Sequence, residues 1–163
     1  MWLSVYLCQS AHLCLKFECR EGMKDTELKG IRDRDLFLAY QQALKEHSFQ
    51  NQWEAIEYVR KSSAPRFYIS SKVCSLLLGK LFAGQRLEQM HPLSYRRIKH
   101  LEKMYKNYVA GEVGKKGMSR ERICEILVDM PAPEFYISNL WATRIINKEI
   151  ARHNEERLRR NAI

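Results

Sequence analysis

The sequence predicts an all-α protein made of two tandem three-helix repeats that pack into one compact body. Its 163 residues are 45% hydrophobic and 29% charged, a composition that can bury a core. Glycine (7 residues) and proline (4) are too scarce for a β-sandwich or barrel with many tight turns. Six of the seven residues in 64–70 recur at 132–138, an offset of 68 residues. A pattern shared at one fixed period indicates one supersecondary unit used twice.

Residues 1–22 differ in character from the rest and are expected to be an N-terminal extension that is disordered or not native. We expect translation to begin at Met23, where a polar helix start follows. A secretory signal is not expected, since the basic residues follow the apolar part. Four side chains here could surround a zinc ion: Cys8, His12, Cys14 and Cys19. They lack the close cysteine pairs of structural zinc sites, so we expect no metal and no cofactor; a small zinc protein is the third-ranked alternative.

Cysteine content and charge narrow the choice of cellular compartment and of binding partner. Five cysteines without a disulfide framework favour a reducing compartment, hence the cytoplasm. Cys74 and Cys124 are expected on apolar helix faces as small hydrophobes. No stretch reaches the roughly 18 apolar residues of a membrane helix. With 28 basic against 19 acidic residues, the net charge is +9, which attracts polyanions.

The first repeat is assigned to residues 23–90 and the second to residues 91–163. The first helix is expected over 33–47 in one copy and over 92–113 in the other. The N–H groups of the first helical turn have no partner within the helix. Pro92, which lacks an N–H, therefore suits that turn. The apolar positions of the two copies coincide when the sequences are aligned at the offset of 68.

The second helix of each repeat is predicted to begin after Asn51 or Ser119, which occupy equivalent positions. Their side-chain oxygens can accept from free backbone N–H groups, and Asn51 with Glu54 has capping-box spacing. The proline of the repeated block then ends that helix, and the Phe and Ile of the block fill the core. The serine that closes the block, Ser70 or Ser138, is expected to cap the third helix.

The third helices, 71–83 and 139–160, differ in polarity. Residues 71–83 have little polar surface, so we expect them to be buried against the second repeat. We interpret Tyr68 and Tyr136 of the block as structural residues, with a ligand or nucleic-acid contact as the alternative. Trp141 aligns with Val73 and is therefore expected in the core.

The third helix of the second repeat is basic along one face. At 100° per residue, four of its cations fall within about 80° of one another and can hold phosphates. Neighbouring amide and hydroxyl side chains can reach base edges. The candidate nucleic-acid-binding residues are Asn139, Thr143, Arg144, Asn147, Lys148, Arg152 and Arg159.

A solvated helix explains the same pattern, because Glu155–Arg159 and Glu156–Arg160 are i,i+4 pairs. A second basic region is expected to continue the phosphate-facing surface. It comprises Arg96, Arg97, Lys99, His100, Lys103, Lys106, Lys115 and Lys116.

Each repeat has three predicted helices, and a turn joins the last two. This arrangement alone resembles the helix-turn-helix class. The connection over 63–70 is longer than the three or four residues of the compact DNA-binding motif. No catalytic motif is present, and the histidines are scattered, so we expect no enzyme. The sequence favours a basic protein that binds DNA or RNA through the second repeat as an accessory or regulatory factor. The alternative is a structural or adaptor module that binds a protein partner, or a second copy, through helix faces.

Overall fold

The computed structural model describes residues 25–87, 89–111 and 117–161. Within these ranges every regular element is an α-helix, which confirms the all-α prediction for this part of the chain. The expected extension 1–22, with its cysteines and His12, lies outside the described residues. The helices are α1 (Asp25–Glu46), α2 (Gln52–Lys61), α3 (Ser71–Phe82), α4 (Pro92–Gly111), α5 (Arg120–Val128) and α6 (Asn139–Asn161).

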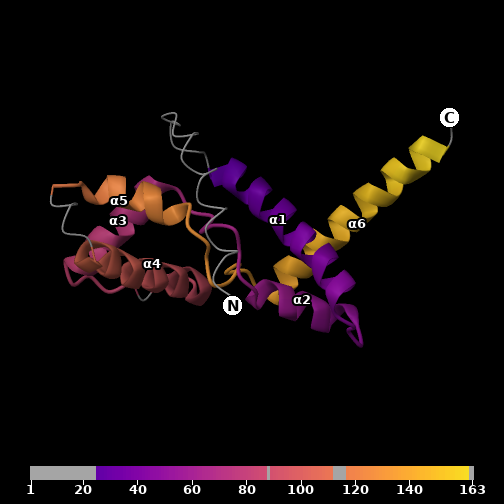
Figure 1. The fold of residues 1–163 in the computed structure, drawn as a ribbon, viewed down its shortest axis with the longest axis horizontal. Coiled ribbons are helices and arrows are strands. Elements are labelled where there is room, and N and C mark those ends of the chain that lie inside the picture. Colours follow the sequence, from indigo (N-terminus) through magenta and orange to yellow (C-terminus); the bar gives the residue numbers. More distant parts are fainter. Residues whose placement is uncertain (1–24, 88, 112–116, 162–163) are drawn as a thin grey trace, which may run out of the picture.

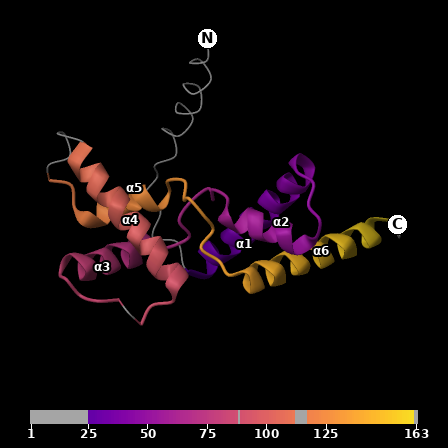
Figure 2. The same ribbon diagram turned by 90° about the horizontal axis from the view of Figure 1, so that it is seen from below.

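The helices pack in two groups that do not follow the order of the chain. α1, α2 and α6 contact one another, and α3, α4 and α5 contact one another. Figure 1 shows the first group on the right and the second on the left, and the turned view in Figure 2 separates them in the same way. α3 therefore packs on α4 and α5, and α6 packs on α1 and α2. We expected residues 71–83 to pack on the later helices, but nothing in the sequence indicated that α6 packs on α1 and α2.

The two repeated blocks cross each other where the helix groups meet. Ala64 N donates to Ala132 O over 2.8 Å, and Ala132 N donates to Ala64 O over 2.9 Å, in an isolated antiparallel bridge. In a second pair of bonds, Phe67 N donates to Val128 O (3.0 Å) and Phe135 N donates to Arg60 O (3.1 Å). The two donors are 68 residues apart, and so are the two acceptors. Each block thus binds the end of the other repeat's second helix, with the same bonds in both directions.

Aromatic rings of the two blocks stack across this crossing. The ring centroids of Phe67 and Tyr136 are 5.9 Å apart, and those of Tyr68 and Phe135 are 6.0 Å apart. Phe67 and Phe135 are buried and belong to one continuous hydrophobic core that extends through both helix groups. Since the core does not divide between the groups, removal of either phenylalanine will weaken both.

Local capping chemistry fixes the starts of four helices as the sequence predicts. Asn51 accepts from the backbone N–H of Glu54, and the Glu54 carboxylate accepts from Gln50 N, one residue before the N–H that a capping box uses. The other caps are serine hydroxyls that accept from a backbone N–H three residues ahead: Ser70 from Val73, Ser119 from Arg122 and Ser138 from Trp141.

Cys74 and Cys124 are buried and form no disulfide, as expected. No helix among the described residues is long and apolar enough to cross a membrane.

Candidate nucleic-acid interface

The first half of α6 is held in the core, and its second half extends beyond the other helices. Ala142, Ile145 and Ile146 are buried, and their i, i+3, i+4 spacing places one apolar face against α1 and α2. His153 stacks on Phe37 of α1 with ring centroids 5.2 Å apart. Figure 1 shows α6 continuing past α1 toward the C-terminus. The cations of the predicted stripe therefore lie in two settings, one beside α1 and one on the projecting end.

The side chains of the three candidate residues for base contacts are either hydrogen-bonded within the protein or partly buried. Asn139 is partly buried, and its Oδ1 is a buried atom without a hydrogen-bond partner. Thr143 Oγ1 donates to the backbone oxygen of Asn139 over 2.8 Å. Asn147 is exposed, and its Oδ1 accepts from Gln52 Nε2 of α2 over 2.9 Å. Thr143 and Asn147 thus bind groups of the protein, whereas the Oδ1 of Asn139 is buried and out of reach of a base.

The candidate cations divide between the projecting end of α6 and its anchored half. Arg152 lies between two glutamates, with Nη2 2.6 Å from Glu149 and Nε 3.9 Å from Glu156. Arg160 is 3.7 Å from Glu156, so the projecting end of α6 is partly neutralised. Arg144, Lys148 and Arg159 are exposed. Arg144 and Lys148 lie one turn apart on the half of α6 that is anchored to α1 and α2.

Trp141 is not a core residue, and that prediction is wrong. Its side chain is 52% exposed, because the buried face of α6 passes through Ala142, Ile145 and Ile146 and leaves residue 141 beside it. The guanidinium carbon of Arg144 lies 5.2 Å from the centroid of the indole ring, and Lys29 Nζ of α1 lies 5.7 Å from it. Both distances are within the range of cation–π attraction. An exposed indole between two cations is thus the centre of this surface.

A hollow of about 330 Å³ lies beside this indole. It is formed by α1, the start of α4, the second repeated block and the start of α6, and none of the described residues that line it is acidic. Its polar and aromatic lining consists of Lys29, Arg32, His91, Tyr136, Ser138 and Trp141. Asp33 partly balances one of these cations, since Arg32 donates to its Oδ1 over 2.8 and 3.1 Å.

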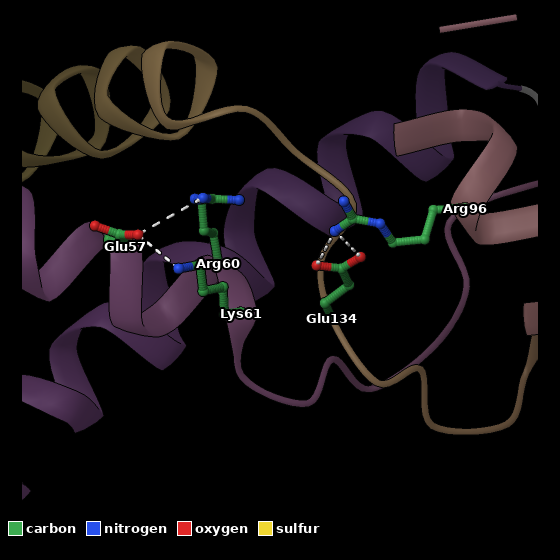
Figure 3. A network of polar contacts seen from close by, with 5 residues as sticks. All are labelled: Glu57, Arg60, Lys61, Arg96 and Glu134. Atoms are coloured by element: carbon green, nitrogen blue, oxygen red, sulfur yellow. Dashed lines mark hydrogen bonds and ion pairs between the residues drawn. The ribbon is translucent and has the colours of Figure 1, made fainter. Parts of the chain in front are cut away.

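Most cations of the second basic region that the structure describes bind groups of the protein itself. Arg96 binds Glu134 over 3.1 and 3.4 Å, as Figure 3 shows, and Arg97 donates to Tyr68 O over 3.0 Å. Lys99 and Lys106 both bind Glu102, whose pKa is lowered by hydrogen bonds from Lys106 and Lys99. Lys115 and Lys116 lie outside the described residues.

The tyrosines of the repeated blocks are buried, which supports their structural interpretation. Tyr68 OH donates to Asp35 Oδ2 over 2.9 Å, and Tyr136 OH binds Nδ1 of His100. Burial is the main cause that raises the pKa of both hydroxyls above the ordinary value of 10.0. Their hydroxyls thus bind side chains of α1 and α4.

Sequence reasoning missed Lys29 and His91 and misplaced Trp141. The available signal was the pair Trp141 and Arg144, three residues apart on a helix whose apolar face was already complete without the tryptophan. Lys29 gave no signal, because its approach to α6 depends on the exchange of third helices. Comparison of the chain with protein-family models, with curated proteins and with solved structures found no match.

Proposed function

We propose that this chain is a non-enzymatic, cytoplasmic nucleic-acid-binding protein that acts as an accessory or regulatory factor. Its interface is the anchored half of α6 with the facing part of α1. One observation carries the proposal: the half-exposed indole of Trp141 lies between Lys29 and Arg144 at the edge of a hollow without acidic lining among the described residues. Cations beside an exposed aromatic ring are the combination that tracks a phosphate backbone and stacks a base.

Charge supports the same assignment. The net charge of +9 draws a polyanion toward the protein, and release of counterions from the phosphates favours binding. Arg144 and Lys148 supply exposed cations one turn apart on α6, and Lys29 adds a third from α1. Arg152 contributes less because Glu149 and Glu156 already neutralise it.

We also infer that the fold is two equivalent three-helix repeats that exchange their third helices. α2 and α5 begin 68 residues apart, and so do α3 and α6. The reciprocal hydrogen bonds between the two blocks join residues that are equivalent at the same offset. The helix-turn-helix resemblance is then one of helix order, because the helix that completes each group comes from the other repeat.

The proposal is tested by fluorescence-anisotropy titration of labelled DNA and RNA at several salt concentrations. Binding should weaken steeply with salt, and Arg144→Gln or Lys148→Gln should each reduce the slope of log K against log salt by about one. Arg152→Gln is the matched control on the same helix and should change the slope less. Absence of binding to either polymer at low salt refutes the function; equal slopes in all variants refute the site.

The alternative of an adaptor module is supported by a different surface. A hollow of about 590 Å³ between the end of α3 and the start of α4 is lined mostly by apolar side chains, among them Leu81, Leu87, Met90 and Tyr95. Such a surface favours contact with another protein. This function predicts a defined oligomer by light scattering and no binding of nucleic acid at moderate salt.

A further inference from the structure

We propose that the nucleic acid bound by this surface is single-stranded, with one unpaired base stacked on the indole of Trp141 and the adjoining phosphate between Lys29, Arg144 and His91. This inference rests on the proposed function and specifies the form of its ligand. It follows from three features: an aromatic ring at the edge of the hollow, two cations close to that ring, and a size that suits one nucleotide.

The aromatic face distinguishes a single strand from a duplex. In a duplex the faces of the bases are covered by their neighbours, so an indole can stack only on a base that has left the helix. Trp141 is 52% exposed, and it borders a concave space of about 330 Å³. That volume lies at the lower end of the range for small-ligand pockets, so it suits one nucleotide and not the flank of a double helix.

Two cations and one imidazole lie near the indole and can bind one phosphate. Lys29 of α1 lines the hollow, and Arg144 of α6 lies over the indole at the edge of the hollow. His91, which precedes α4, also lines the hollow. Leu93 N donates to His91 Nδ1 over 3.3 Å, which leaves Nε2 of His91 as the ring nitrogen that can donate to a phosphate oxygen. In the free protein Lys29 and Arg144 lie over the indole. A bound nucleotide replaces both contacts with stronger ones, because the phosphate binds the cations and the base stacks on the ring.

The backbone at the hollow supports a functional assignment. Tyr136, which lines it, has φ of +50°, a left-handed conformation that is unusual for a residue other than glycine. The equivalent Tyr68 of the other block is absent from the described non-glycine residues with positive φ. Strain of this kind gathers at ligand sites, and here it occurs only in the copy that carries the indole.

The other helix group provides an internal comparison. Val73 and Leu76 of α3 stand at the positions of Trp141 and Arg144, and Arg97 stands at the position of Lys29. Leu76 is 57% exposed, and Arg97 donates to Tyr68 O. The equivalent surface therefore has neither an indole nor a cation beside it on the third helix, so we assign one nucleotide site to the protein and not two.

The test compares a labelled oligo(dT) of about 15 nucleotides with a duplex of the same length, by anisotropy at low salt. The intact chain should bind the single strand about ten-fold more tightly than the duplex. Trp141→Leu should remove about ten-fold of the single-strand affinity and leave duplex binding unchanged, whereas Trp141→Phe should retain most of it. Trp53→Leu is the matched control, since Trp53 is 55% exposed on α2 and does not line the hollow.

A second readout does not depend on the folding of the leucine variant. In Trp2→Phe/Trp53→Phe protein the remaining tryptophan is Trp141, so stacking of oligo(dT) should quench the fluorescence at saturation. If both polymers bind equally and the fluorescence does not change, the inference is wrong and the proposed function stands. If neither polymer binds, the proposed function fails as well.

Discussion

The two helix groups are alike where they are buried and different where they face solvent. Phe67 and Phe135 make equivalent hydrogen bonds and equivalent ring contacts at the crossing. On the third helices, however, Val73 is replaced by Trp141 and an exposed leucine by Arg144. The repeated residues are therefore those that the exchange of helices requires, and the surface of each group has its own chemistry.

The one residue that differs between the two blocks shows the same division. Arg66 of the first block forms an ion pair with Asp129 over 2.5 Å. Its equivalent is Glu134, which binds Arg96 of α4 over 3.1 Å, with the opposite sign of charge (Figure 3). Arg66 connects its block to the other repeat, whereas Glu134 binds a helix of its own repeat, so the residue that differs also differs in what it connects.

The largest expected effect comes from separating the repeats. The fragments 23–90 and 91–163 each lack the third helix that completes their own first two, so neither should fold alone. An equimolar mixture should recover helix content and a cooperative melt, because each fragment supplies the helix that the other needs. Circular dichroism of both fragments and their mixture measures this. Cooperative melting of fragment 23–90 by itself would contradict the exchange.

The next effect tests whether the buried crossing is equivalent in both groups. Phe67→Ala and Phe135→Ala should each lower the free energy of unfolding by about 3–5 kcal/mol, because both rings are fully buried. Urea titration should give similar losses and one transition in each variant. A small loss in one variant only would mean that the core does divide between the groups. Leu158→Ala is the control, because it shortens a side chain on α6 that is 66% exposed and therefore not part of the core.

A smaller effect is expected at alkaline pH. Burial raises the pKa of Tyr68 and Tyr136 in the folded protein, whereas in the unfolded chain both ionise near the ordinary value of 10.0. Above this pH the unfolded state releases protons that the folded state retains, so the free energy of unfolding falls as pH rises. Urea midpoints measured from about pH 9 to 11 should fall less in Tyr68→Phe and Tyr136→Phe than in the unaltered chain. Equal slopes in all three proteins would show that the hydroxyls ionise in the folded state.

The smallest effect concerns the caps of the third helices. Ser70→Ala and Ser138→Ala each remove an oxygen that accepts from a backbone N–H, at 3.4 and 3.3 Å. We expect each to cost about 1 kcal/mol of unfolding free energy, with most of it recovered by Asp at the same position. Thermal melts of the four variants measure this. Loss in one variant alone would show that the two third helices do not begin alike.

Much of the fold could be read from the sequence because its signals are local. The caps at Asn51, Ser70, Ser119 and Ser138 act within three residues, so their residue types were sufficient. The expected first helix at 33–47 began too late, since α1 starts at Asp25. Its first turns carry Gly30 and few apolar residues, and they are helical because Leu28 is buried in the folded protein.

The candidate site was harder to predict because it depends on contacts between distant segments. The stripe on α6 follows from helical periodicity, and its binding of nucleic acid stays a prediction. The pairing of Arg152 with Glu149 and the approach of Lys29 to Trp141 require coordinates. Alignment with Val73 placed Trp141 in the core, which assumes that equivalent positions have equivalent surroundings. Exchanged and unexchanged third helices bury the same residues, so apolar periodicity alone could not distinguish them.

The packing of α6 on α1 and α2 also sets the order of events on the ribosome. α1 and α2 are complete at residue 61, but the helix that covers their apolar faces begins at residue 139. At about 5–20 residues per second, translation needs roughly 4–16 s to cover that distance. During this interval the incomplete chain exposes the apolar faces of α1 and α2. A neighbouring nascent chain can then supply its α6 in place of the α6 of the same chain.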